Sequence, residues 1–171
     1  TVATACSSSA RAFISAARLI EAGICDAVVV AGTDTLSRIA VAGFESLGVL
    51  SLEPCLPFHR SRSGMNIGEG TAMCVLSHEM LGDRSTMLMG YGASSDGYHI
   101  SSPEPTGTYA AIAMKDALKA AGLKSSDIGY VCLHGTGTKL NDGMDAKAVA
   151  KVFPDVPASS IKHLTGHTLG A

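Results

Sequence analysis

One cysteine at the start of a predicted helix has the environment of a nucleophile. Cys6 stands in Thr4-Ala5-Cys6-Ser7-Ser8-Ser9, directly before a segment whose apolar side chains recur at helical spacing. A thiol at a helix start faces unpaired backbone N–H groups and the positive end of the helix dipole, so we expect its pKa to fall. The alternative is that Cys6 is a buried packing residue, as free cysteines usually are.

Two histidines and a lysine could support such a thiol. His134 ends a short apolar run and begins His-Gly-Thr-Gly-Thr, and His167 lies in Thr-Gly-His, five residues after Lys162. Open parallel sheets place their sites at the ends of strands. Each histidine alone could be structural. Together with Cys6, two neutral imidazoles and an ammonium are suited to stabilise an oxyanion or enolate beside a thiolate nucleophile.

Helical and strand patterns alternate along the chain and predict an α/β fold. The predicted helices cover residues 10–20, 36–47, 109–120 and 142–153, and the predicted strands cover 27–31, 71–77, 87–93, 128–133 and 158–161. Long loops over 49–70 and 94–107 carry prolines and glycines, and loops of that length are often functional.

Several residues define these elements more closely. Gly23 and Gly122 are predicted to end two helices, and Gly82-Asp83 to join two strands into a hairpin. The run 27–31 is continuously apolar, which predicts a strand buried on both faces. Asp142 is predicted to cap the last helix. The expected core side chains are those of Val75, Met89, Val149, Val152 and Phe153.

Composition excludes several classes of protein. Apolar residues make up 46% of the 171 residues and charged residues 16%, which is enough for a well-buried core. The net charge of −2 is spread along the chain, so we expect no nucleic-acid partner and no membrane surface. With no apolar run near 20 residues and no signal pattern, the predicted location is cytoplasmic. Five cysteines without regular spacing indicate reduced thiols and no zinc site, and no glycine motif indicates a nucleotide.

Five motifs follow one another along the chain. They are Thr4-Ala5-Cys6-Ser7-Ser8; Pro57-Phe58-His59 with Gly68-Glu69-Gly70; Asp96-Gly97-Tyr98-His99 through Pro103; His134-Gly135-Thr136-Gly137-Thr138 with Asn141-Asp142; and Lys162-His163-Leu164-Thr165-Gly166-His167. In their order and spacing, these motifs resemble those of the β-ketoacyl-acyl carrier protein synthases, the condensing enzymes of fatty acid and polyketide synthesis, and their elongating branch most closely.

This resemblance implies a partial thiolase-like fold of layered sheets with helices between them. Residues 1–79 would be the end of the first half of that fold and residues 80–171 the start of the second half, so the sequence is expected to be a fragment and, on its own, to turn over slowly or not at all. The sequence departs from the family where two loop aspartates are expected, at His59 and Ser63. We expect the salt bridges of that loop to differ.

The resemblance also implies a role for each site residue. Cys6 would accept an acyl chain as a thioester, and His134 and His167 would hydrogen-bond the malonyl thioester and stabilise its enolate. Lys162 would orient the histidines, and Thr136 and Thr138 would contact phosphopantetheine or only cap backbone. No metal or bound cofactor is expected, because decarboxylation itself would supply the carbanion, and the substrates would be carried on phosphopantetheine. The implied partners are an acyl carrier protein and a related subunit in a homodimer or heterodimer.

Two other functions remain open at this point. The first is a cysteine hydrolase that uses Cys6, His134 and Asn141 as nucleophile, base and orienting group. The second is a catalytically silent fragment or partner subunit of a condensing-enzyme dimer. Inactive partners usually lack the cysteine that this sequence carries at position 6.

Overall fold

The computed structural model describes all residues, 1–171, and divides them into two units. The first unit comprises Thr1–Gly43, Ile67–Met87 and His167–Ala171, and the second comprises Phe44–Asn66 and Leu88–Gly166. None of the helices combines the length and the apolar character that crossing a membrane requires.

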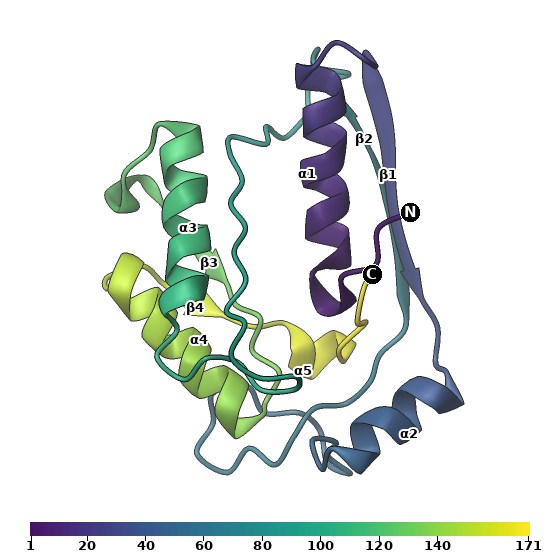
Figure 1. Ribbon diagram of the computed structural model, residues 1–171, viewed down its shortest axis with the longest axis vertical. Helices are drawn as coiled ribbons and strands as arrows, with labels where there is room; N and C mark the ends of the chain where they lie inside the picture. Colours follow the sequence, from purple (N-terminus) through teal and green to yellow (C-terminus); the bar gives the residue numbers. More distant parts are fainter. The chain divides into compact units, whose positions relative to one another are not determined.

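The first unit is a two-stranded sheet with a helix on one face (Figure 1). A 3₁₀ turn, η1 (Ala5–Ser7), leads directly into α1 (Ser8–Glu21), which packs on the antiparallel pair β1 (Ala27–Asp34) and β2 (Gly70–Ser77). As predicted, Gly23 follows the end of α1, and its φ of +67° suits the left-handed conformation that glycine adopts at low cost. The helix α2 (Arg38–Ser46) crosses the boundary between the units.

The prediction that the first strand is buried on both faces is wrong. Val29 and its partner Val75 are 62% and 52% exposed, whereas Val30 is 7% exposed. Successive side chains of a strand point to opposite faces, and α1 covers only one of them. Val75, predicted as a core residue, therefore lies on the open face of the sheet.

The second unit is built around two packed helices, α3 (Thr108–Ala121) and α4 (Lys139–Val152). Beside them lie η2 (Ser125–Asp127), the short parallel strands β3 (Val131–Cys132) and β4 (Ala158–Ser159), and α5 (Lys162–Thr165) (Figure 1). The core contains Ala111, Ala148, Val149, Val152 and Phe153. Three of these are the core residues predicted for the last helix, and Gly122 ends α3 as predicted, in the left-handed conformation.

The predicted strand over 87–93 and its hairpin through Gly82 are wrong. These residues form no strand, and Met89 is 50% exposed. The backbone at Gly90 and Gly92 instead lies against α3, so closely that a Cβ at residue 90 would be 2.5 Å from the carbonyl oxygen of Ala117. Glycine at these two positions permits contact with a helix, which a pattern of alternating side chains does not reveal.

Candidate active site

The thiol of Cys6 lies in η1, immediately before α1. Side-chain hydroxyls brace this turn: the Ser7 Oγ donates to the Thr4 carbonyl at 2.8 Å, and the Ser8 Oγ donates to the Ala5 carbonyl at 2.7 Å. Ala5 takes a positive φ of +52°, which is uncommon for a residue with a side chain and marks a sharp turn. Cys6 is exposed, so the alternative of a buried packing residue is wrong.

Within the first unit, Cys6 contacts His167. Its Nε2 lies 3.1 Å from Cys6 Sγ, and its ring is 4% exposed. The Leu169 N–H donates to His167 Nδ1 at 3.2 Å, so a neutral ring carries its proton on Nε2. That N–H is a donor aimed at the sulfur. His167 is therefore placed to stabilise a thiolate or a nearby oxyanion, whereas a general base would need an unprotonated nitrogen there.

The turn that carries His167 is fastened to the rest of the first unit by backbone hydrogen bonds. The N–H groups of Gly170 and Ala171 donate to Asp34 Oδ2 at 2.7 and 2.9 Å, and the Gly68 N–H donates to the His167 carbonyl at 2.9 Å. Ser9, on α1, donates to the Gly170 carbonyl. These contacts bring Cys6 and His167 together although 161 positions separate them.

His134 lies in the second unit and is neutral at pH 7. Burial lowers the pKa of His134 to about 4, helped by the positive charge of Lys162 and opposed by the negative charge of Asp142. The charge of Lys162 is thus close enough to act on His134. The structure therefore brings two of the predicted site residues together in each unit: Cys6 with His167, and His134 with Lys162.

Two buried carboxylates hold the backbone that follows His134. Asp145, 5% exposed, accepts the Gly135 N–H at 3.0 Å, and burial raises its pKa. Asp142, 1% exposed, accepts the Gly137 N–H at 3.1 Å and the Phe58 N–H at 2.8 Å. These bonds fix the path of residues 134–138, the histidine loop, because buried N–H groups must find acceptors.

The helix-capping role predicted for Asp142 is wrong. Helix α4 begins at Lys139 with Thr138 in the N-cap position, so Asp142 lies within its first turn and turns its carboxylate toward the histidine loop. Asp145 was not predicted as a site residue at all. Asp142 and Asp145 precede Ala148, Val149 and Val152 at helical spacing, so two carboxylates on an otherwise apolar helix face were the available signal.

The hydroxyls of Thr136 and Thr138 lie beside each other in the histidine loop, with their Oγ1 atoms 2.9 Å apart. Thr136 is 5% exposed, and its carbonyl accepts a hydrogen bond from the buried Cys55 thiol at 3.1 Å. Gly137 has a φ of +77°, and a Cβ there would be 2.6 Å from Cys55 Sγ. Glycine at residue 137 thus lets the loop pass close to Cys55.

The loop in which the family aspartates are replaced makes other contacts. The Ser63 Oγ lies 2.8 Å from the Ser51 Oγ, and His59 Nδ1 accepts the Ser61 N–H at 3.2 Å. The one ion pair of the loop that the geometry defines joins Arg62 Nε to Asp142 Oδ2 at 3.4 Å. At the two positions where the resemblance leads us to expect aspartates, a hydroxyl and an imidazole therefore make hydrogen bonds inside the loop.

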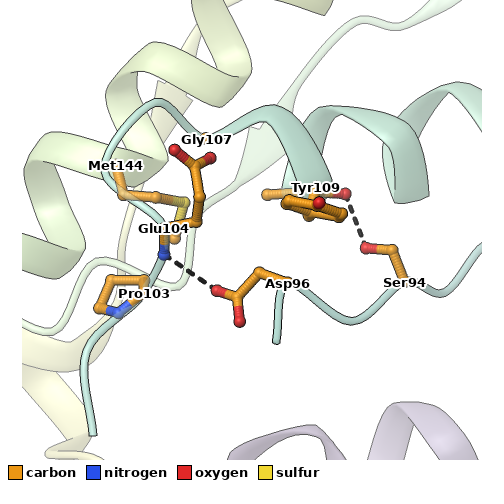
Figure 2. Close-up of a pocket in the computed structure, with 8 residues that line it drawn as sticks. Ser94, Asp96, Pro103, Glu104, Gly107, Tyr109 and Met144 are labelled. Atoms are coloured by element: carbon orange, nitrogen blue, oxygen red, sulfur yellow. Dashed lines mark hydrogen bonds between the residues drawn. The ribbon is translucent and has the colours of Figure 1, made fainter. Parts of the chain in front are cut away.

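The loop over 94–107 encloses a small cavity of about 190 Å³ in the second unit (Figure 2). Asp96 accepts the Glu104 N–H at 2.9 Å, and Ser94 donates to the Tyr109 carbonyl at 2.7 Å. Hydrogen bonds from the Glu104 and Tyr98 backbone lower the pKa of Asp96. Lys147 on α4 donates to the Pro105 carbonyl at 2.8 Å, so both helices hold this loop.

Comparisons with known proteins match the whole length of the chain. Residues 1–80 match the family described as β-ketoacyl synthase, N-terminal domain, and residues 86–171 match β-ketoacyl synthase, C-terminal domain. The chain is 33% identical over 183 residues to 3-oxoacyl-acyl-carrier-protein synthase 2 of Staphylococcus aureus, covering 98% of this chain and 45% of that protein. The chain thus spans less than half the length of this relative.

Solved structures give the same result. A ketosynthase in complex with its chain length factor, from Xenorhabdus doucetiae, is 48% identical with a TM-score of 0.92 over 100% of this chain and 42% of that one. A β-ketoacyl synthase from Burkholderia phymatum is 36% identical with a TM-score of 0.90 over 99% of this chain and 44% of that one. These likenesses confirm the predicted fold class, a partial thiolase-like α/β fold. The chain belongs to the β-ketoacyl synthase family.

Proposed function

We propose that this chain contributes to a β-ketoacyl-acyl carrier protein synthase, which joins an acyl group to a malonyl unit by decarboxylative Claisen condensation. The observation that carries the proposal is the Nε2–H of His167 aimed at Cys6 Sγ at 3.1 Å, with Nδ1 held by the Leu169 N–H. A donor in that position favours the thiolate and stabilises developing negative charge nearby.

The proposed reaction has two steps. The Cys6 thiolate attacks the carbonyl carbon of an acyl thioester, and the carrier sulfur leaves as a thiolate, so that the acyl group becomes a Cys6 thioester. A malonyl thioester then loses carbon dioxide, and the electron pair of the broken C–C bond forms an enolate. Its oxygen accepts hydrogen bonds from His134 and His167 while its carbon attacks the acyl-Cys6 carbonyl and expels the thiolate. A neutral His134, with a pKa of about 4, suits a donor to an enolate.

The remaining roles belong to the same proposal. Lys162 orients and polarises the histidines, which agrees with its electrostatic effect on His134. Thr136 and Thr138 contact the phosphopantetheine arm through which an acyl carrier protein delivers both substrates. Residues 1–79 and 80–171 belong to the first and second halves of the fold, and the working protein is a cytoplasmic homodimer or heterodimer with a related subunit.

Alkylation of the purified chain tests the nucleophile. Treatment with iodoacetamide between pH 6 and 9, with adducts mapped by mass spectrometry, should modify Cys6 faster at pH 7 than Cys74 and Cys132, which are also exposed. His167→Ala should slow Cys6 and leave the other two unchanged. His163→Ala, an exposed histidine four positions earlier, is the matched control. Equal rates for Cys6 and Cys74 would remove the thiolate from the proposal.

Histidine variants of a full-length homologue separate condensation from the two alternatives. The counterpart of His134→Ala should retain acylation of the nucleophile and lose malonyl decarboxylation by about 10²–10³-fold, the usual cost of one oxyanion donor. Loss of both steps together would favour a cysteine hydrolase with His134 as base. If the unmodified protein carries out neither acylation nor malonyl decarboxylation, a silent partner subunit is favoured.

A further inference from the structure

A buried serine connects the two segments that carry His134 and Lys162. Ser160 lies between β4 and α5 (Figure 1) and is 6% exposed. Its Oγ donates to the carbonyl of Gly135, the residue after His134, at 2.8 Å. The same Oγ accepts the backbone N–H of Lys162 at 3.3 Å. A hydroxyl has one donor and two acceptor positions, so both hydrogen bonds form at once.

The backbone on both sides of His134 is anchored to neighbouring residues of one segment. The Leu133 N–H donates to the Ser159 carbonyl at 2.8 Å, and the Gly135 carbonyl accepts the Ser160 hydroxyl. Gly135 has a φ of +43°, and a Cβ there would be 2.4 Å from the Ser160 Cβ. Glycine thus allows a direct contact between the histidine loop and Ser160. Displacement of this segment would therefore displace His134.

The backbone pairing of β3 and β4 does not extend to Lys162. Each strand has two residues, and the last pair is Cys132 with Ser159. Lys162 opens α5, a helix of four residues, and Ile161 in the N-cap position has no polar side chain to accept a hydrogen bond. The first N–H groups of a helix have no partner within it. Ser160 is thus the acceptor that fastens the first N–H of α5 to the histidine loop.

The charge of Lys162 acts on the His134 ring. After burial, the positive charge of Lys162 is the next largest cause of the low pKa of His134. The interaction between charges weakens with distance, and a lysine side chain is long and flexible. The effect of Lys162 on His134 therefore depends on where α5 begins relative to the histidine loop.

We propose that Ser160 is a positioning residue, which sets the place of the Lys162 ammonium relative to the His134 ring by joining the histidine loop to the start of α5. This inference rests on the proposed function, in which His134 donates to the enolate oxygen and Lys162 polarises the ring. Without the hydroxyl, the Gly135 carbonyl loses its donor and the Lys162 N–H loses its acceptor, so the two segments separate more freely. The ammonium then lies further from the imidazole on average, and its effect on the ring weakens.

A double-mutant cycle measures the coupling between Lys162 and His134 in the full 171-residue chain. NMR titration gives the pKa of His134 in the parent chain, in Ser160→Ala, in Lys162→Met and in the double variant. Lys162→Met should raise the pKa of His134 in the parent chain, because it removes a positive charge that lowers it. In the Ser160→Ala background, the same replacement should raise the pKa by less than half as much. Equal rises in the two backgrounds, or no rise in the parent chain, would overturn the proposal.

The neighbouring serine provides the matched control. Ser159→Ala removes a hydroxyl one position earlier, which bonds to the Tyr130 hydroxyl at 2.5 Å. This variant should leave the coupling between Lys162 and His134 unchanged. A reduction equal to that in Ser160→Ala would overturn the proposal, because the loss of either hydroxyl would then have the same effect.

Two further points keep the cycle decisive. The carboxylates of Asp142 and Asp145 are present in all four proteins, so they affect both comparisons alike. Far-UV circular dichroism checks that each variant is folded. If Ser160→Ala does not fold, Ser160→Cys takes its place, because a thiol is only a weak donor and acceptor. The coupling should fall in Ser160→Cys as well, and an unchanged coupling would overturn the proposal.

Kinetics of the full-length homologue separate this inference from the proposed function. The counterpart of Ser160→Ala should lower kcat for malonyl decarboxylation by about 10–10²-fold, the scale expected for a misplaced catalytic group. It should change KM by less than twofold, because the Ser160 hydroxyl bonds to backbone groups. An unchanged kcat in an active homologue would overturn the role of Ser160 and leave the proposed function intact. A homologue without malonyl decarboxylation would overturn the proposed function, and the NMR cycle would still decide whether Ser160 places Lys162.

Discussion

Removal of the Asp142 carboxylate should strongly destabilise the second unit. Asp142 is 1% exposed and accepts hydrogen bonds from two backbone N–H groups, those of Phe58 and Gly137, at 2.8 and 3.1 Å. It also pairs with Arg62 Nε at 3.4 Å, and the Arg62 side chain is 20% exposed. One carboxylate therefore connects the loop around Phe58 to the histidine loop.

The expected loss follows from these contacts. Asp142→Ala leaves two N–H groups without an acceptor, and each buried unmade hydrogen bond costs about 1–3 kcal/mol. The ion pair adds little by itself, because Arg62 is partly hydrated, but the remaining charge loses its partner. We expect the free energy of unfolding to fall by about 2–6 kcal/mol, the cost of two buried N–H groups left without an acceptor. Asp142→Asn should cost about 2–3 kcal/mol, since its amide retains one acceptor oxygen and sets an NH₂ group against the other donor.

Urea unfolding followed by far-UV circular dichroism measures this loss. The comparison requires that the dependence of the free energy of unfolding on urea concentration has the same slope in the variant and the parent chain. The matched control is Asp116→Asn on the exposed surface of α3, which should change the free energy of unfolding by less than about 0.5 kcal/mol. If Asp142→Ala proves too unstable to purify, Asp142→Asn gives the comparison. A loss below about 1 kcal/mol for Asp142→Asn would mean that water or another donor set compensates, and the assignment of Asp142 as the tie would be wrong.

Three further predictions concern the histidine loop. In an NMR titration, the His134 ring should protonate with a midpoint near pH 4. The free energy of unfolding should therefore decline as the pH falls from about 6.5 to about 4, because in that range the unfolded chain binds the proton and the folded chain does not. A midpoint at or above pH 6.5 would contradict the burial of the ring. Asp145→Asn should destabilise at pH 7 by less than about 1 kcal/mol in urea unfolding, since burial raises the pKa of Asp145 and an amide oxygen can still accept the Gly135 N–H; a loss as large as that of Asp142→Asn would show that its charge is needed. Gly137→Ala should cost about 1–3 kcal/mol in the same assay, since its φ is +77° and its Cβ would be 2.6 Å from Cys55 Sγ; an unchanged midpoint would mean that the loop shifts freely.

Helices could be predicted from the sequence because their signals are local. The apolar spacing in residues 10–20 and 109–120, together with Gly23 and Gly122, identifies α1 and α3 to within a few residues. The segment 87–93 has an equally clear strand pattern but forms no strand. A strand exists only with a hydrogen-bonding partner, and these residues lie against α3 instead, a contact that depends on tertiary structure.

The candidate site, like the fold, could be predicted only where its signals are local. Cys6, His134, Lys162 and His167 could be identified from motifs, since each stands in a short and specific local sequence. The proton position on His167 could not, because it depends on the N–H of Leu169 folding back onto Nδ1. Asp145 was missed for a related reason: a carboxylate is read as solvent-exposed unless its helix face is known to be buried, and only the packing of α4 settles that.

The two parts of the site also differ in what maintains them. The histidine loop around His134 is held by carboxylates ten or fewer positions away, on the adjoining α4, so its geometry depends mainly on local folding. The contact of Cys6 with His167 requires the hydrogen bonds from Gly170 and Ala171 to Asp34, which close a loop of more than 130 positions. The entropy of closing such a loop grows only logarithmically with length, and folding of the second unit within it shortens the effective span. We therefore expect the nucleophile to acquire its donor only after the chain between them has folded, whereas the His134 loop can form with its own helix.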